Sequence, residues 1–150
     1  MPQTTFWDFA EKIAIPLIVA GITYFIARKQ LVNSGVTQFR QQWINDLRNS
    51  ISLFITEAEI IAMIDMSDDK LYFEHFRELS QMSTRIALML NPNEEEHESL
   101  NRCVEKIRDV IHNEKISEEK LGKKLNKNIE ELLIVAKQVL KKEWVRVKKN

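Results

Sequence analysis

The chain has 150 residues, with 22 Lys and Arg against 22 Asp and Glu, and it contains 3 Gly, 3 Pro and 1 Cys. So few turn-forming residues exclude a β-sandwich or β-barrel, because those folds need a turn roughly every 8–12 residues. A single Cys excludes an internal disulfide framework and a zinc site built from several Cys. A net charge of zero argues against general nucleic-acid binding, and a hydrophobic content of 44% is too low for a protein with many membrane spans.

The first element is an apolar stretch near the N-terminus. Residues 13–27 are fifteen positions without a charge, and the predicted transmembrane helix is 6–28, since a membrane span needs about 20 mostly apolar residues. Phe6 and Trp7 are then expected at the headgroup level, and Lys12 reaches outward to water.

Two other interpretations of this stretch are a cleaved signal peptide and a buried core helix. The acidic start and the absence of a small-residue cleavage site argue against the signal peptide. The following segment has amphipathic helices of its own to bury, which argues against the core helix. Basic residues follow the stretch, beginning with Arg28 and Lys29, which are expected to contact the membrane. The positive-inside rule therefore places the N-terminus outside and residues 28–150 in the cytoplasm, at a bacterial-type inner (plasma) membrane.

Apolar residues recur at helical spacing through the rest of the chain. On the helix that follows the apolar stretch, this spacing puts one apolar stripe on the side away from water, with Phe39, Trp43, Leu47, Ile51, Phe54, Ala58 and Ile61. The pattern predicts helices over about 36–61, 71–89, 94–111 and 117–144, with breaks near Ser67 and at Asn91-Pro92-Asn93. The predicted fold is all-α: a single N-terminal transmembrane helix followed by an antiparallel cytoplasmic four-helix bundle of residues 34–150. Ser34-Gly35 is a weak point, where the span and the next helix either join or hinge.

The last helix ends in a basic, aromatic segment that the bundle topology directs back toward the membrane. Residues 137–150 hold six Lys and Arg against Glu143, a net charge of +5, whereas residues 57–105 hold twelve acids and four bases, a net charge of −8. Contact with anionic lipid is one interpretation, and a solvated helix end or contact with RNA are the others. The residues expected at the membrane here are Lys141, Lys142, Trp144, Arg146, Lys148 and Lys149.

Small residues in the apolar stretch predict self-association, because they let helix backbones approach closely in lipid. The expected subunit contacts are Ala14 and Gly21 in the stretch, with Phe39, Trp43 and Leu47 on the helix that follows.

Little in the sequence points to catalysis. No glycine-rich phosphate loop is present, and the three His are scattered without metal-ligand spacing, so we predict no metal and no cofactor. Cys103 lies on an apolar stripe and is expected to be a small buried side chain. Arg108 and His112 lie four apart on one predicted helix, where an arginine for phosphate and a histidine for acid–base chemistry would suit RNA cleavage.

This pair resembles the arginine, polar residue and histidine of HEPN ribonucleases, although RDVIH has only three residues between Arg108 and His112. In element order the whole chain resembles the membrane accessory protein of type VI-B CRISPR systems, a divergent HEPN-like bundle with an N-terminal membrane helix. That resemblance implies an oligomeric membrane pore in phage defence rather than an enzyme.

Three functions follow as hypotheses. The first is a self-associating single-pass membrane protein that acts as a pore or membrane-perturbing effector. The second is a membrane-tethered module that recruits a cytosolic protein. The third is a HEPN-like ribonuclease that uses Arg108 and His112. The expected partners are the lipid bilayer and further copies of the chain, or a cytosolic protein, and nucleic acid is not expected.

Overall fold

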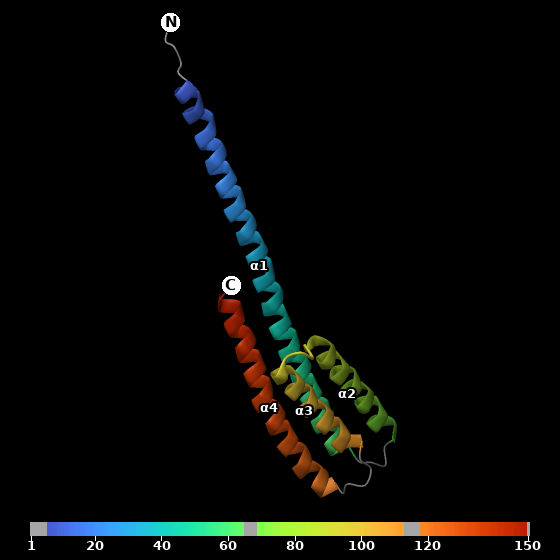
Figure 1. Ribbon diagram of the computed structural model, residues 1–150. Coiled ribbons are helices and arrows are strands. Elements are labelled where there is room, and N and C mark those ends of the chain that lie inside the picture. The colour runs from blue at the N-terminus through green and yellow to red at the C-terminus, as the bar shows by residue number, and fades with distance from the viewer. Residues whose placement is uncertain (1–5, 65–68, 113–117, 150) are drawn as a thin grey trace. The chain divides into compact units, whose positions relative to one another are not determined.

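The computed structural model of the protein describes residues 6–64, 69–112 and 118–149, which form four helices (Figure 1). These are α1 (Phe6–Met63), α2 (Asp69–Met89), α3 (Glu95–His112) and α4 (Glu118–Lys149). The side chains of 6–11, 13, 30, 32–34, 118–120 and 149 lie outside the described part. All regular structure in the described residues is helical, so the predicted all-α class is confirmed.

The chain divides into two units, residues up to Phe39 and a bundle of Arg40–Lys149. Within the bundle, the later part of α1 runs antiparallel to α2, α2 to α3, and α3 to α4 (Figure 1). The predicted helical bundle is therefore confirmed, and it lies in the compact unit of Arg40–Lys149. Its core draws on all four helices, and the largest fully buried side chains include Phe54, Leu79, Leu100, Ile107 and Leu132.

The apolar stripe predicted on the first bundle helix forms the α1 side of this core. Leu47, Phe54 and Ala58 have no exposed surface, and Trp43 packs against the core from its edge. Phe39 differs from the prediction, because 75% of it is exposed. The stripe therefore turns into the core one helical turn later than the spacing indicates.

The α2–α3 connection lies where Asn91-Pro92-Asn93 predicted a break. The Asn91 side-chain Oδ1 accepts a hydrogen bond from the backbone N–H of Asn93 (3.1 Å), and the Glu94 carbonyl accepts the first bond of α3 from Glu98 (3.0 Å). Such local bonds from Asn favour a turn over a continued helix. At Gly35, by contrast, α1 continues as one helix.

No helix in the described residues is both long enough and apolar enough to cross a membrane. The predicted transmembrane helix over 6–28 is therefore unsupported. The uncharged described stretch, residues 14–27, covers about 21 Å of helix, against roughly 30 Å of bilayer hydrocarbon. The rest of the predicted span includes the side chains of 6–11 and 13, which lie outside the described part.

Candidate functional site

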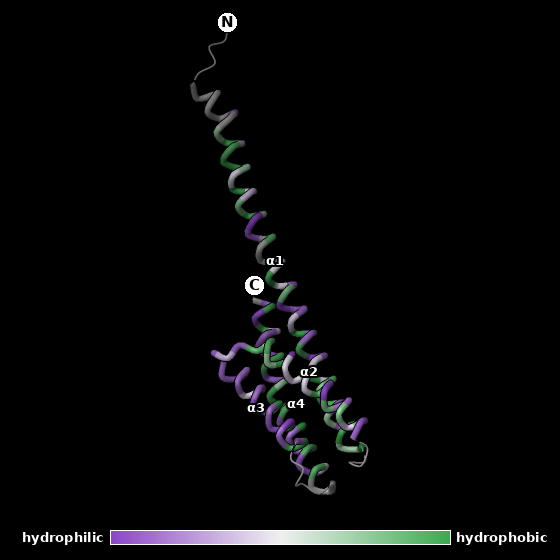
Figure 2. The backbone as a smooth tube through the Cα atoms, turned by 90° about the vertical axis from the view of Figure 1, so that its right-hand side faces the viewer, coloured by the Kyte–Doolittle hydropathy of each residue, from purple (hydrophilic) through white to green (hydrophobic). Residues whose placement is uncertain are grey.

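The first candidate site is an apolar segment of α1, defined here as residues 14–27. Every one of its side chains is exposed in the chain, and the segment is hydrophobic along most of its length (Figure 2). Lys12, Arg28 and Lys29 at its two ends are exposed as well, whereas the side chains of Phe6 and Trp7 lie outside the described part. The large apolar side chains are between 50% and 70% exposed, and they are Ile15, Leu17, Ile18, Val19, Ile22, Tyr24, Phe25 and Ile26.

The second candidate site is a groove between α1 and α4 in the bundle, which we call the α1–α4 groove. Two adjoining hollows of about 440 and 600 Å³ share Arg48, Lys137 and Leu140 among their lining residues. The apolar residues of the first hollow come from both helices, and they are Ile51, Ile55, Ile129, Leu133, Ala136 and Leu140. The second hollow ends at Trp144, which is 44% exposed.

A third feature is an ion-pair cluster that joins the end of α4 to the start of α3. Arg146 donates to both carboxylate oxygens of Glu94, at 3.1 and 2.8 Å, and it also pairs with Glu143. Lys142 lies 2.7 Å from Glu96, and Arg40 of α1 lies 3.6 Å from Glu143. Two of the basic residues expected to contact lipid, Lys142 and Arg146, are therefore paired with acids of their own chain.

This pairing shifts the titration of the groups involved. The hydrogen bonds from Arg146 lower the pKa of Glu94 from 4.5 to about 2, and the bond from Lys142 lowers the pKa of Glu96. The same bond to Glu94 raises the pKa of Arg146. Hydrogen bonds to the charged form of a carboxyl stabilise that form, so Glu94 stays ionised well into the acid range.

His97 lies beside the cluster and brings it near the geometry of a metal site, since ligand atoms of Glu94, His97 and Glu143 lie within 4.8 Å of one another. The ring stacks on Trp43 (5.7 Å between centroids), and Nδ1 accepts the backbone N–H of Asn91 (3.0 Å). This bond assigns the proton of the neutral ring to Nε2, which has no partner among the described residues. Neither ring nitrogen of His97 then has a free lone pair with which to bind a metal ion. Arg146, which pairs with both Glu94 and Glu143, already supplies the positive charge that balances these carboxylates. The arrangement is that of an ion-pair cluster rather than a metal centre.

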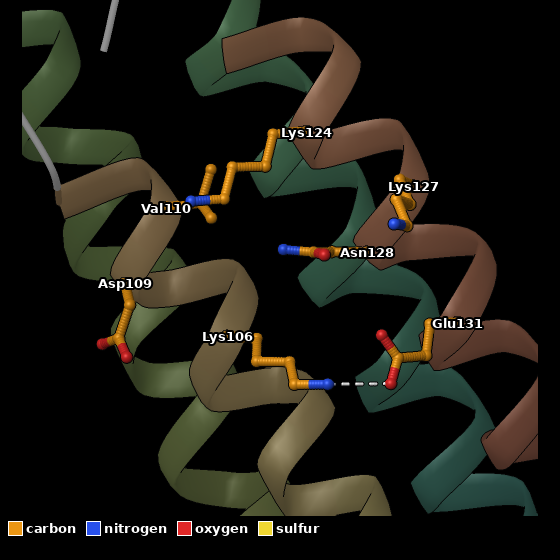
Figure 3. Close-up of a pocket in the computed structure, with 7 residues that line it drawn as sticks. All are labelled: Lys106, Asp109, Val110, Lys124, Lys127, Asn128 and Glu131. Carbon is orange, nitrogen blue, oxygen red and sulfur yellow. Dashed lines mark hydrogen bonds and ion pairs between the residues drawn. The ribbon is translucent and has the colours of Figure 1, made fainter. Parts of the chain in front are cut away.

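A shallow pocket between α3 and α4 carries several lysines (Figure 3). Lys124 and Asn128 extend from α4 toward α3, and Lys106 forms an ion pair with Glu131 at 2.8 Å. This bond raises the pKa of Lys106 and lowers that of Glu131. Because Lys106 is paired with Glu131 and Asp109 also lines the pocket, the pocket has no strong preference for an anion.

Arg108 and His112 both lie in the second half of α3. Arg108 is exposed on α3, and the ring of His112 stacks on Phe76 with centroids 5.8 Å apart. Within the described residues, no hydrogen bond or ion pair joins the two side chains. Cys103 is buried as predicted, and burial raises the pKa of its thiol, which disfavours a nucleophilic thiolate.

The residues expected at subunit contacts differ in how exposed they are. Ala14, Gly21 and Phe39 are exposed, Trp43 is half-buried, and its indole N–H donates to the carbonyl of Met89 at 3.0 Å. Leu47 is fully buried in the core of its own chain, so it has no surface to offer a second copy.

The other basic residues near the end of α4 are exposed where their side chains are described. Lys141 and Lys148 are exposed, and Lys148 lies over the ring of Trp144 at 5.8 Å from the centroid. The side chain of Lys149 lies outside the described part. The α1–α4 groove and the ion-pair cluster were not predicted from the sequence, since both depend on residues that are far apart along the chain.

Comparison with models of protein families, with characterised proteins and with solved structures found no match to this chain.

Proposed function

We propose that this chain is a membrane-attached interaction protein. In this proposal the apolar segment of α1 inserts into a lipid bilayer, and the bundle of Arg40–Lys149 binds a protein outside the lipid. The observation that carries the proposal is the exposure of the apolar segment on every side of the helix. A helix that packs on one protein partner needs only one apolar face, whereas a helix in lipid is apolar all round.

The energetic argument supports the same conclusion. Complete burial of one large apolar side chain stabilises by about 1.5–3 kcal/mol, so covering the exposed half of eight such side chains is worth on the order of 10 kcal/mol. Backbone polar groups add little cost, because a helix satisfies its own N–H and C=O groups in lipid. An exposed apolar surface of this extent is typical of a membrane or protein interaction site.

The pore function expected from the sequence stays a prediction. An aqueous pore through the bilayer needs polar groups along its lumen. Within the apolar segment only Thr23 and Tyr24 carry polar side-chain groups. The interaction function is therefore the better supported of the two. The predicted orientation, with the bundle in the cytoplasm, likewise stays a prediction.

Flotation of the full-length protein with neutral phosphatidylcholine vesicles tests the attachment. The parent chain should float with the vesicles in about 1 M salt, where charge attraction is screened to roughly 3 Å. The double variant Ile18→Glu, Ile22→Glu puts two charges in the segment and should lower the floating fraction at least about tenfold. The matched control Leu53→Glu, Leu88→Glu changes two exposed leucines of the bundle and should float as the parent does. Equal flotation of both variants, or none of the parent, contradicts the proposal.

A further inference from the structure

We propose that the α1–α4 groove binds an amphipathic helix of a partner protein whose flanks are acidic. This inference rests on the proposed function, in which the bundle is the part that binds, and it adds the chemistry of the partner. It concerns only residues of the bundle, so it can be tested separately from membrane attachment.

The shape of the groove fits a helix. Its lining on α1 extends from Gln41 to Glu59, and this length of helix measures about 27 Å, or five turns. On α4 the lining extends from Ile129 to Trp144. Both walls contribute apolar side chains, including Leu133, of which 38% is exposed. A helix that lays an apolar stripe into a groove is a recurring mode of protein recognition.

The charged residues beside the groove favour acidic side chains on the flanks of the partner helix. Arg48, Lys137 and Lys141 line the two hollows, against one acid, Glu59. All four are exposed. Lys137 and Lys141 have no ion-pair partner among the described residues, unlike Lys142 in the ion-pair cluster. Acidic side chains on both flanks of a bound helix would meet these bases, and charge complementarity of this kind sets specificity and speeds association.

A second copy of the chain is a poorer occupant than an acidic helix. Arg48 and Lys137 line the same two hollows, near the middle of the groove. If two copies met groove to groove about a two-fold axis, Arg48 and Lys137 of one copy would face the same bases of the other, whether the two grooves ran parallel or antiparallel. Like charges in contact oppose such an interface.

The test measures binding of a synthetic helical peptide to the full-length protein in lipid nanodiscs. The probe has leucines at helical spacing and glutamates on both flanks, and its control peptide carries lysines in place of the glutamates. We expect the Glu-flanked peptide to bind at least about tenfold more tightly than the Lys-flanked peptide at low salt. Empty nanodiscs report the binding that lipid alone contributes.

Two neighbouring substitutions show whether binding occurs in the groove. Leu133→Asp changes a lining residue and should weaken binding at least about tenfold, since a charge is unfavourable against an apolar contact. Ile134→Asp changes the next residue, which is more exposed and does not line either hollow, and should bind within about twofold of the parent. The double variant Lys137→Glu, Lys141→Glu should reverse the preference between the two peptides.

Three results would overturn the inference. They are equal binding of both peptides, equal effects of Leu133→Asp and Ile134→Asp, and a change in the chain's own oligomeric mass caused by Leu133→Asp alone, which would identify a second copy as the occupant. Peptide binding by a chain that does not float with vesicles would refute membrane attachment and leave the groove assignment standing.

Discussion

Arg146 near the end of α4 and Glu94, the residue just before α3, are joined by two hydrogen bonds of 3.1 and 2.8 Å. The two residues are 52 positions apart in the sequence, and the pair fixes the end of the last helix to the α2–α3 turn. Paired, two-bond contacts between arginine and carboxylate are stronger and more specific in geometry than single ion pairs. Arg146 also pairs with Glu143, whose side chain is only 7% exposed.

Loss of Arg146 should therefore destabilise the bundle. Arg146→Ala leaves Glu94 and the buried Glu143 without their main partner. We expect the free energy of unfolding to fall by about 1–3 kcal/mol. This is less than the full cost of breaking a buried ion pair, because the Arg146 side chain is 37% exposed. Thermal unfolding of the full-length protein in mild detergent, followed by circular dichroism, measures this loss.

The control is Arg102→Ala, because Arg102 pairs with Glu98 one turn away on the exposed face of α3. We expect a change of less than about 0.5 kcal/mol for such a surface pair. If the two variants unfold at the same temperature, the cluster does not contribute to stability as described here.

The same pair predicts a specific dependence of stability on pH. Since the folded state lowers the pKa of Glu94 from 4.5 to about 2, the stability that this group adds is complete above about pH 4.5. It is lost as the pH falls from there toward 2, because protonation then favours the unfolded chain. Glu94→Gln should therefore show a smaller fall in unfolding temperature than the parent between pH 5 and 2.5. Glu95→Gln, which changes an exposed neighbour, is the control and should show the same fall as the parent.

Phe54 and Leu53 provide a matched test of the core. Phe54 is fully buried and Leu53 is 49% exposed, although they are consecutive on α1. Phe54→Ala should cost about 3–5 kcal/mol, because it removes buried contacts and leaves a cavity. Leu53→Ala should cost less than about 1 kcal/mol. Denaturant unfolding of the two variants measures both values, and similar midpoints would contradict the assignment of Phe54 to the core.

Cys103 should be unreactive in the folded protein. It is buried on α3, and burial raises the pKa of its thiol, so little thiolate forms near pH 8. We expect a thiol reagent to modify it at least about tenfold more slowly in the folded than in the denatured chain. Thr84→Cys in a Cys103→Ala background places a thiol on an exposed position of α2 and should react rapidly in the folded state. Fast modification of Cys103 before unfolding would contradict its burial.

The sequence was informative where a helix buries one face. Spacing placed Leu47, Ile51 and Phe54 on the core side of α1, and each is buried. Asn91 marked the turn between α2 and α3, because its side chain bonds locally to the backbone. These features depend on neighbours within a few residues, which a sequence pattern records.

Contacts between distant residues could not be predicted in this way. The basic residues Lys142 and Arg146 were expected to face lipid, and Glu94 and Glu96 were noted only as part of the acidic stretch 57–105. Their pairing depends on how α4 returns along α3, which no local spacing records. The α1–α4 groove likewise combines residues of α1 and α4 that are 70 or more positions apart. Phe39 fits the helical spacing of the core stripe but lies outside the bundle.

The most direct test of membrane attachment asks whether water reaches the apolar segment. Ile18→Cys and Ile22→Cys, each in a Cys103→Ala background, are incorporated as full-length protein into vesicles and treated with a charged maleimide. Leu53→Cys in the same background reports an exposed position in the bundle. A thiol in lipid cannot ionise, so we predict labelling of positions 18 and 22 at least about tenfold slower than that of position 53, with full labelling after denaturation. Labelling of all three positions at the same rate would show that the apolar segment lies in water and would contradict the account.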